Sequence, residues 1–272
     1  MNWNPHLEIA EKAARAAGDL LIAHRDEEHR IGFKGAVDLV TEMDERSQAL
    51  IHSILSTRFP DHGFLAEEGL DSQDGSEYRW IFDPLDGTTN FAHGFPIFAV
   101  SIALQERGRT ILGVVFDPPR DEMFTAVKGQ GAHLNGRHIS VSGVRDLGRS
   151  LLATGFPYDV RESAQNNLDH FADFAVRAQA LRRCGSAALD LCYVACGRFD
   201  GFWELKLAPW DVAAGILLVR EAGGRVTDFR GGDQDIFGPE VLASNGLVHE
   251  DMIRVLEMRL DSCGSKSLSR TR

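Results

Sequence analysis

Hydrophobic residues recur at two different spacings along the chain. Within residues 7–24 and 41–59 they return every three or four positions with charged residues between them, which predicts two amphipathic helices. Thr41 is the candidate N-cap of the second helix. Short apolar runs, which alternate with polar residues from about residue 96 onward, predict strands. The strands predicted in this half span residues 64–66, 78–82, 98–104, 110–116 and 123–127.

A β-hairpin is predicted around Asn135-Gly136, because this dipeptide favours the tight turns that join antiparallel strands. The strands on either side contain His133 and His138. We therefore interpret these two histidines as hairpin residues and not as metal ligands.

The second half of the chain alternates between helical and strand patterns. The predicted helices span residues 163–179, 186–196, 211–222 and 249–260, and the predicted strands span 150–154, 181–184, 199–204, 225–228 and 241–244. We expect a single unit, residues 1–262, made of two packed halves. The first, to about residue 145, combines helices with an antiparallel sheet, and the second, about 146–262, is mixed α/β. Residues 263–272 are rich in Ser and basic residues and are expected to form a flexible tail.

Composition restricts the function. The 272 residues include 29 Lys and Arg against 40 Asp and Glu, a net charge of −11, which argues against a broad nucleic-acid-binding face. No apolar run approaches the roughly 20 residues that span a bilayer. Residues 1–6 lack the basic start and apolar region of a signal peptide. Four cysteines are too few for a disulfide scaffold, and we expect Cys192 and Cys196 to be small buried residues. These features predict a cytoplasmic protein.

Two carboxylates, Asp83 and Asp86, follow a hydrophobic strand and are separated by Pro84 and Leu85. Proline has no N–H and a fixed φ, so it makes the turn rigid and can leave the Leu85 carbonyl free to act as a ligand. Asp-Pro and Asp-Gly are also common in ordinary turns, so a turn without function is an equal alternative.

The residues after this pair and two other acidic sites favour a function. Gly87 permits close approach of a ligand to the backbone, and Thr88 can cap a short helix whose N–H groups face an anion. Glu67-Glu68 follows another strand, and Asp211 begins an apolar helix. Taken singly, Glu67 and Glu68 could form a solvated loop and Asp211 could be an N-cap. Together, hard oxygen ligands beside helix starts indicate Mg²⁺ and metal-assisted phosphoryl chemistry.

Five segments, in order and across about residues 7–260, resemble the inositol monophosphatase family, and most of all its bacterial members. They are residues 38–44 (DLVTEMD), 66–69 (AEEG), 83–91 (DPLDGTTNF), 181–188 (LRRCGSAA) and 207–215 (LAPWDVAAG) with 221–224 (EAGG). The resemblance implies an α/β (α+β) fold, layered as the αβαβα sandwich shared with fructose-1,6-bisphosphatases. It also implies Mg²⁺-dependent hydrolysis of a small phosphate monoester, that is, a phosphoric monoester hydrolase, in a homodimer inhibited by Li⁺.

The resemblance also assigns roles to individual residues. It implies two or three Mg²⁺ ions held by Glu67, Asp83, the Leu85 carbonyl, Asp86 and Asp211. Asp44 and Thr88, together with Glu67, would orient and deprotonate the attacking water. The substrate would contact Glu67, Leu85, Asp86, Gly87, Thr88, Gly185, Ser186, Ala187, Glu204 and Asp211. Within this set, Gly87 and Thr88 would hold phosphate oxygens through their N–H groups, and Glu204 would accept hydrogen bonds from sugar hydroxyls.

The substrate within the family is indicated by Thr89-Asn90-Phe91, which resembles inositol monophosphatases proper more than the nucleotide-phosphatase or histidinol-phosphatase branches. Hydrolysis of inositol monophosphate is therefore the main prediction. Fructose-1,6-bisphosphate, or another small sugar or nucleotide phosphate, is the alternative. Residues 33–37 are about one residue shorter than in animal relatives, a difference that bears on metal affinity and Li⁺ sensitivity.

A role of a different class is a binding function, because some bacterial relatives associate with the transcription machinery. Arg182 and Arg183 could serve such a protein surface, or could instead be paired in the interior or at a dimer interface. No membrane and no direct nucleic-acid partner are expected.

Overall fold

The computed structural model describes residues 3–27, 31–33, 39–72 and 75–265. The helices of these residues are α1 (Asn4–His24), α2 (Glu42–Arg58), α3 (Thr88–Ala92), α4 (Leu168–Ala175), α5 (Ala187–Ala195), α6 (Pro209–Glu221) and α7 (His249–Ser265). Two single 3₁₀ turns lie at Pro118–Arg120 and Leu147–Arg149.

The larger sheet has eight strands in the order β10-β9-β8-β7-β6-β5-β3-β4. In chain order they are β3 (Gly63–Ala66), β4 (Asp71–Ser72), β5 (Tyr78–Asp86), β6 (Ala99–Glu106), β7 (Arg109–Asp117), β8 (Glu122–Val127), β9 (Ala132–Leu134) and β10 (Arg137–Ile139). Its strands pair antiparallel except for β3 and β5, which are parallel. This sheet is the antiparallel sheet predicted for the first half.

The smaller sheet has five strands in the order β12-β11-β13-β15-β14. They are β11 (Leu151–Thr154), β12 (Ala180–Arg182), β13 (Gly201–Leu205), β14 (Arg225–Thr227) and β15 (Glu240–Ser244). The pairs β11–β12 and β11–β13 are parallel and the others antiparallel, as a mixed α/β half requires. A separate two-stranded ladder joins β1 (Ile31–Phe33) and β2 (Leu39–Thr41).

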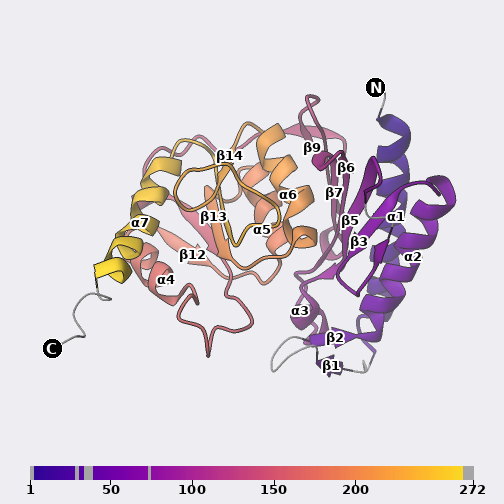
Figure 1. Ribbon diagram of the computed structural model, residues 1–272, viewed down its shortest axis with the longest axis horizontal. Coiled ribbons are helices and arrows are strands. Elements are labelled where there is room, and N and C mark those ends of the chain that lie inside the picture. Colours follow the sequence, from indigo (N-terminus) through magenta and orange to yellow (C-terminus); the bar gives the residue numbers. More distant parts are fainter. Residues whose placement is uncertain (1–2, 28–30, 34–38, 73–74, 266–272) are drawn as a thin grey trace.

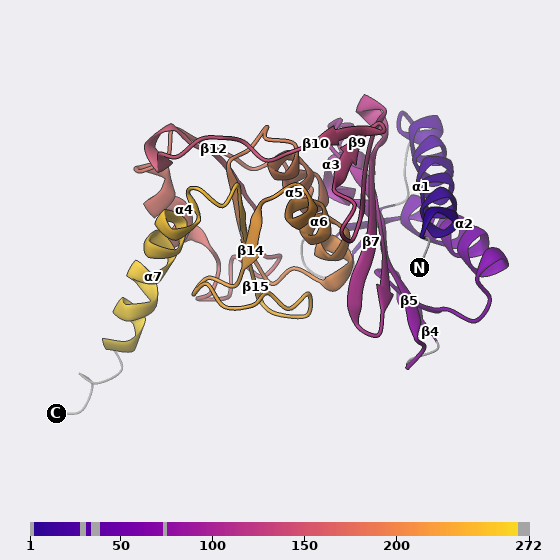
Figure 2. The same ribbon diagram turned by 90° about the horizontal axis from the view of Figure 1, so that it is seen from above.

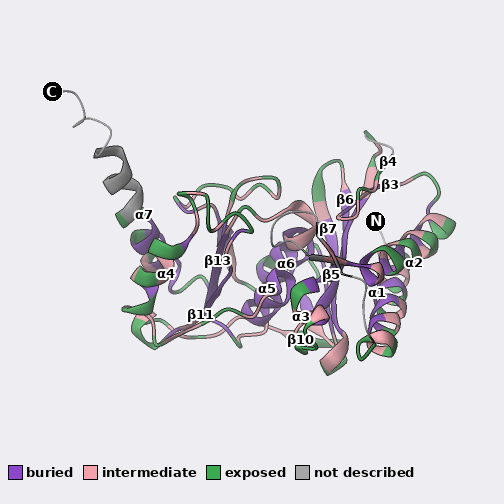
Figure 3. Ribbon diagram, turned by 90° about the horizontal axis from the view of Figure 1, so that it is seen from below, coloured by how far each residue is buried: buried purple, intermediate pink, exposed green. Residues whose placement is uncertain are grey.

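The elements stack in five layers, helix–sheet–helix–sheet–helix (Figures 1 and 2). Helices α1 and α2 cover the outer face of the larger sheet, α5 and α6 fill the space between the sheets, and α4 and α7 cover the smaller sheet. This arrangement confirms the predicted αβαβα sandwich. The middle layer is almost wholly buried (Figure 3), because α5 and α6 are apolar on nearly every side.

Small residues permit close packing at the centre of this stack. A Cβ on Gly113 of β7 would lie 2.9 Å from the carbonyl oxygen of Ala214 on α6, so the helix touches the strand backbone. A Cβ on Gly215 would lie 2.6 Å from Leu191 on α5. The helix that carries Asp211 is thereby fixed against the larger sheet and against α5, its neighbour in the same layer.

Several predicted elements are confirmed in kind with shifted ends. Thr41 is the N-cap of α2, and its hydroxyl accepts a hydrogen bond from the N–H of Met43. The hairpin pairs His133 with His138 across a turn in which Asn135 and Gly136 both have positive φ. Helix α7 continues to Ser265, three residues into the predicted tail; residues 266–272 lie outside the described part of the chain.

Two predicted elements are wrong in extent. The helix expected over residues 163–179 is only α4, because Asn167 adopts a left-handed conformation before it and residues 179–180 donate to the carbonyl of Ser150 at the start of β12. The strand expected to end at residue 82 continues as β5 to Asp86, with its register shifted between Asp83 and Asp86. The predicted Asp-Pro turn is therefore an irregular strand end.

Candidate functional site

A cavity of about 400 Å³ lies where the ends of β3 and β5 meet the N-termini of α3, α5 and α6 and the strand β13. All but one of the predicted site residues line it. They are Glu67, Asp83, Leu85, Asp86, Gly87, Thr88, Gly185, Ser186, Ala187, Glu204 and Asp211. The exception, Asp44, lies directly behind Thr88, and the fold thus brings the whole predicted set together.

The end of β5 is held by hydrogen bonds from its own turn and from α2. The carboxylate of Asp83 accepts from the N–H of Leu85 at 2.8 Å, and the hydroxyl of Ser47 donates to the Pro84 carbonyl at 2.8 Å. The sequence suggested a free Leu85 carbonyl. In the structure this carbonyl accepts a hydrogen bond from the Thr88 hydroxyl at 3.0 Å. A carbonyl oxygen has a second lone pair, so it remains available to a ligand.

Asp44 connects the start of α2 to Thr88. One of its carboxylate oxygens accepts from both the N–H and the hydroxyl of Thr41, at 2.8 and 2.7 Å. The other accepts from the Thr88 hydroxyl at 2.9 Å. Burial raises the pKa of this carboxyl above its ordinary value, although the three hydrogen bonds oppose the shift. The Thr88 hydroxyl therefore has two acceptors for its one hydrogen, Asp44 and the Leu85 carbonyl, and these contacts hold its oxygen in place.

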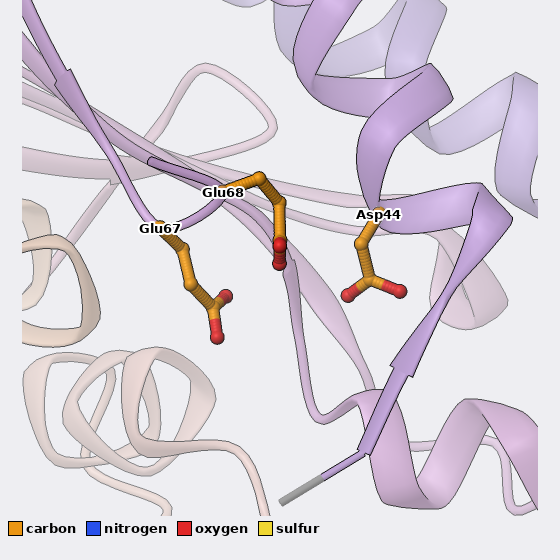
Figure 4. A group of neighbouring side chains, drawn as sticks. All are labelled: Asp44, Glu67 and Glu68. Carbon is orange, nitrogen blue, oxygen red and sulfur yellow. The ribbon is translucent and has the colours of Figure 1, made fainter. Parts of the chain in front are cut away.

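Asp44, Glu67 and Glu68 form a compact acidic group in which the nearest carboxylate oxygens all lie within 4.8 Å of one another. Figure 4 shows Glu67 and Glu68 projecting from the end of β3 toward Asp44 at the start of α2. Both glutamates are half-buried, and the backbone of Glu68 is bonded in both directions to the Gln48 side chain. The pair therefore lies in a loop that is only partly open to solvent, and Glu68, which the sequence named beside Glu67 without a role of its own, lies close to the site.

Asp86 joins the two halves of the molecule. One of its oxygens accepts from the Ser186 hydroxyl at 2.6 Å and from the N–H of Ala188 at 2.8 Å, both at the N-terminus of α5. Burial nevertheless raises the pKa of Asp86 to about 6, since desolvation outweighs these hydrogen bonds. The carboxylate is thus held in place but lacks a compensating positive charge.

Asp211 occupies the third position of α6 rather than its N-cap. The helix begins at Pro209 with Ala208 as the cap, and the Asp211 carboxylate accepts from the Ala208 N–H at 2.7 Å. The N-cap alternative is therefore wrong, because the side chain reaches back across the first turn. Burial, followed by repulsion from Asp86 and Glu67, raises its pKa well above the ordinary value.

Three buried aspartates at this end of the cavity, Asp83, Asp86 and Asp211, have raised pKa values, and the neighbouring Glu67 contributes to each shift. The pKa of Asp83 is raised well above its ordinary value by burial first, and then by Glu67, Asp86 and Asp211. Carboxylates brought together in a buried site are strongly destabilised unless a cation or protons neutralise them. Hard oxygen donors with this uncompensated charge fit Mg²⁺.

Gly87 lines the cavity between its acidic end and the start of α5. Its φ is 97°, and a Cβ there would lie 3.0 Å from the Ile97 carbonyl oxygen and 3.2 Å from that of Gly185. Only glycine fits this close backbone approach without strain. As Gly87 is also the N-cap of α3, the N–H groups that follow it have no acceptor within the helix.

The opposite end of the cavity carries a different set of charges. Glu204, from β13, has its pKa raised to about 8 by burial and then by Asp190, while Arg183 opposes the shift. Asp190 is 1% exposed, and its Oδ1 has no hydrogen-bond partner among the residues described. Arg182 and Arg183 are both exposed, so the interior pairing considered for them is wrong.

Sequence reasoning did not assign Asp190, Gly155 or Asn90 to the site. Asn90 donates to the carbonyls of Ile97 and Cys184, each at 2.8 Å, and so connects α3 to the loop before α5. The available signal for Asp190 was a carboxylate within an otherwise apolar helix. For Gly155 the sequence held no signal.

No helix among the described residues is long and apolar enough to cross a membrane. Cys192 is buried as predicted, and Cys196 is partly buried.

Comparison with known proteins places the chain in a family. Residues 2–260 match the inositol monophosphatase family. The chain is 44% identical over 265 residues to Nus factor SuhB of Pseudomonas aeruginosa, covering 94% of this chain and 97% of that one. It is 46% identical over 252 residues to inositol-1-monophosphatase of Synechocystis, covering 92% and 88%. The solved structure of inositol monophosphatase from Anabaena (Nostoc) superposes with a TM-score of 0.87 at 43% identity, covering 95% and 97%. This chain belongs to the inositol monophosphatase family.

Proposed function

We propose that this protein is a Mg²⁺-dependent phosphatase that hydrolyses inositol monophosphate to inositol and phosphate. The observation that carries the proposal is the cavity with two unlike ends. Glu67, Asp83, Asp86 and Asp211 gather uncompensated carboxylates at one end, and Glu204 presents a single acceptor at the other. A phosphate monoester of a polyol has the matching chemistry, with an anionic group to be bound through cations and hydroxyls to be bound by an acceptor.

In this proposal Glu67, Asp83, the Leu85 carbonyl, Asp86 and Asp211 hold two or three Mg²⁺ ions. The bound cations supply the positive charge that stabilises hydroxide and the phosphoryl oxygens at neutral pH. The compact group of Asp44, Glu67 and Glu68 extends the donor set at the same end. A binding role for Glu68 is a proposal that the geometry adds.

Thr88 and Asp44 position the attacking water. The Thr88 hydroxyl gives its hydrogen to Asp44 or to the Leu85 carbonyl, so its oxygen lone pairs face the cavity as acceptors. A water that donates to this oxygen is oriented toward phosphorus, and its proton can pass through the hydroxyl to Asp44. Asp44 is suited to receive it, because its hydrogen bonds to Thr41 keep the carboxylate oriented.

The substrate is oriented from both ends. The N–H groups of Gly87 and Thr88 hold phosphate oxygens. Gly185, Ser186 and Ala187 line the wall beside the alcohol. Glu204 accepts hydrogen bonds from the hydroxyls of the polyol.

A panel of phosphate esters with Mg²⁺ titration tests the proposal by phosphate release. The panel contains inositol monophosphates, fructose-1,6-bisphosphate, adenosine 3′,5′-bisphosphate and histidinol phosphate. We expect inositol monophosphate to give the highest kcat/KM, with no turnover in the presence of a chelator. Equal or greater kcat/KM for fructose-1,6-bisphosphate would favour the alternative of another sugar phosphatase. Absence of phosphate release from every ester would contradict the phosphatase itself.

A second candidate function is association with the transcription machinery. It is favoured by the relatives named Nus factor SuhB, which match nearly the whole chain. Arg182 and Arg183 are exposed on one short segment and are available to a protein partner. Pull-down from cell extract with wild type and Asp83→Asn would separate the two roles. Capture of RNA polymerase components by both would support a binding role that does not require hydrolysis.

Four further expectations come from the sequence, and two of them, the homodimer and the inhibition by Li⁺, come from the family. We propose that the two halves act as one catalytic unit, that the protein forms a homodimer, that Li⁺ inhibits it and that it is cytoplasmic. Gel filtration, Li⁺ titration and cell fractionation test the last three. Of the shortened loop at 33–37, residues 34–37 lie outside the described part of the chain, so its effect on metal affinity stays a prediction.

A further inference from the structure

Gly155 lies beside Glu204 at the alcohol end of the cavity. A Cβ added to Gly155 would lie 2.0 Å from Oε1 of Glu204, 2.3 Å from Oε2 and 2.3 Å from the carboxyl carbon. The whole carboxylate therefore occupies the volume that any side chain at position 155 would fill. Both residues line the cavity.

The backbone of Gly155 does not itself require glycine. Its φ lies outside the left-handed region, in contrast to Gly87 and Gly185 of the same cavity. An alanine could adopt this conformation without backbone strain. The requirement for glycine thus comes from the Glu204 carboxylate alone.

Nothing else in the described structure holds this carboxylate. Asp44, Asp83, Asp86 and Asp211 each accept a backbone N–H, whereas no hydrogen bond to the Glu204 side chain is formed by the described residues. Glu204 is 8% exposed, so its position is set by the walls around it. The absence of a side chain at Gly155 leaves space for the carboxylate.

Asn167 fixes the distance between the two strands that carry this pair. Its amide N–H₂ donates to the Gly155 carbonyl at 2.6 Å and to the Thr154 hydroxyl at 2.8 Å. Its carbonyl oxygen accepts from the Trp203 indole at 2.8 Å, and the Thr154 hydroxyl donates to the Trp203 carbonyl at 2.6 Å. Position 155 is thereby tied to the residue next to Glu204.

We infer that Gly155 is a positioning residue that determines selectivity for polyol phosphates, and that it acts by reserving space for the Glu204 carboxylate. Asn167 sets the strand spacing on which this fit depends. The inference rests on the proposed function, in which Glu204 accepts hydrogen bonds from the alcohol. It adds that the selectivity depends on the absence of a side chain at Gly155, directly after β11, as much as on the acceptor on β13.

The test compares Gly155→Ala with wild type on two esters. Inositol 1-phosphate has hydroxyls for Glu204, and p-nitrophenyl phosphate has none. We expect kcat/KM for inositol 1-phosphate to fall about tenfold, the loss of a hydrogen bond between the alcohol and Glu204, while kcat/KM for p-nitrophenyl phosphate changes less than about twofold. The folded state should be little affected, because only the end of a flexible side chain must move.

A double-mutant cycle shows whether Gly155 acts through Glu204. In the Glu204→Ala background the carboxylate is gone, so Gly155→Ala should change the ratio of the two kcat/KM values no further. Gly143→Ala is the matched control, because a Cβ there meets no atom within 4 Å and the φ of Gly143 is also outside the left-handed region. It should leave both esters unaffected.

Three outcomes would overturn the inference. They are no change in either kcat/KM value in Gly155→Ala, equal losses on both esters, or a loss of the ratio between the two values that persists in the Glu204→Ala background. A crystal structure of Gly155→Ala tests the steric claim without any activity, since a Glu204 carboxylate in its original place would contradict it. Failure of wild type to hydrolyse either ester would overturn the proposed function and leave this structural test to decide the role of Gly155.

Discussion

The two ends of the cavity hold their carboxylates by opposite means. At the metal end, Asp44, Asp83, Asp86 and Asp211 each accept at least one hydrogen bond from a backbone N–H at 2.7–2.8 Å. At the alcohol end, Glu204 is confined by burial and by the missing side chain of Gly155. Directional hydrogen bonds fix at least one oxygen of each of these four aspartates, whereas space alone fixes the acceptor at the alcohol end. We therefore expect the metal end to determine the chemical step. At the alcohol end, substrate preference can change with small changes in the shape of the surrounding side chains.

Asp83→Asn is the strongest test of this division. Asp83 is 2% exposed and repelled by three other acidic side chains, and an amide cannot replace its charge at a shared metal site. We expect kcat to fall by at least about a thousandfold on every phosphate ester at saturating Mg²⁺, with an unchanged circular dichroism spectrum. Near-normal kcat would contradict the assignment of the metal end. Glu204→Gln is the comparison, and it should reduce kcat/KM only for esters that carry hydroxyls.

Thr88→Val tests the water-positioning contact. Valine has the same shape but cannot donate to Asp44 or accept from water. We expect kcat to fall by about a hundredfold with little change in KM, because the lost contact acts in the chemical step. Thr88→Ser keeps the hydroxyl and should retain most of the activity. If serine and valine were equally impaired, the hydroxyl would not be the group that matters.

The metal end was predictable from sequence because its ligands lie in short segments with strong local rules. Asp83, Asp86, Gly87 and Thr88 fall within six consecutive residues between a buried strand and a helix, where backbone geometry alone sets their spacing. Asp211 follows Pro-Trp at a helix start, which is also a local pattern. Such segments can be interpreted before any tertiary contact is known.

The alcohol end was less predictable because tertiary contacts create it. Gly155, Asn167, Asp190 and Glu204 come from four separate elements or loops, and only their packing shows that the first leaves room for the last. The same reason explains the error over α4, where the helical pattern of residues 163–179 gives way to the left-handed Asn167 that joins β11 to β13. Periodicity records which side of an element is apolar, but not which polar contact interrupts it.

Ser186→Ala has a smaller expected effect, because it removes one support of a metal-end carboxylate and leaves another. The Ser186 hydroxyl donates to Asp86 at 2.6 Å, and the N–H of Ala188 still donates to the same oxygen in the variant. We expect the Mg²⁺ concentration for half-maximal activity to rise about tenfold. Ser142→Ala is the matched control, since Ser142 makes a similar 2.5 Å contact with Asp200 away from the cavity. An equal change in both variants would show a general loss of stability instead.

The pH dependence of stability also distinguishes the metal end from the alcohol end, and the expected effect, a change in Tm, is the smallest of those predicted. In the absence of Mg²⁺, burial raises the pKa of Asp86 to about 6 and of Glu204 to about 8, and raises those of Asp83 and Asp211 well above the unfolded values. The folded state then binds more protons than the unfolded state, so the free energy of unfolding falls as the pH rises from about 4 to about 8. Thermal unfolding across this range should show a Tm that declines by several degrees. Saturating Mg²⁺ should remove the part due to the metal end, because a cation neutralises those carboxylates without protons. Glu204→Gln should reduce the remaining part between about pH 4.5 and 8, to which the buried Asp190 also contributes, and a decline unchanged by both treatments would contradict the division of the cavity into two differently held ends.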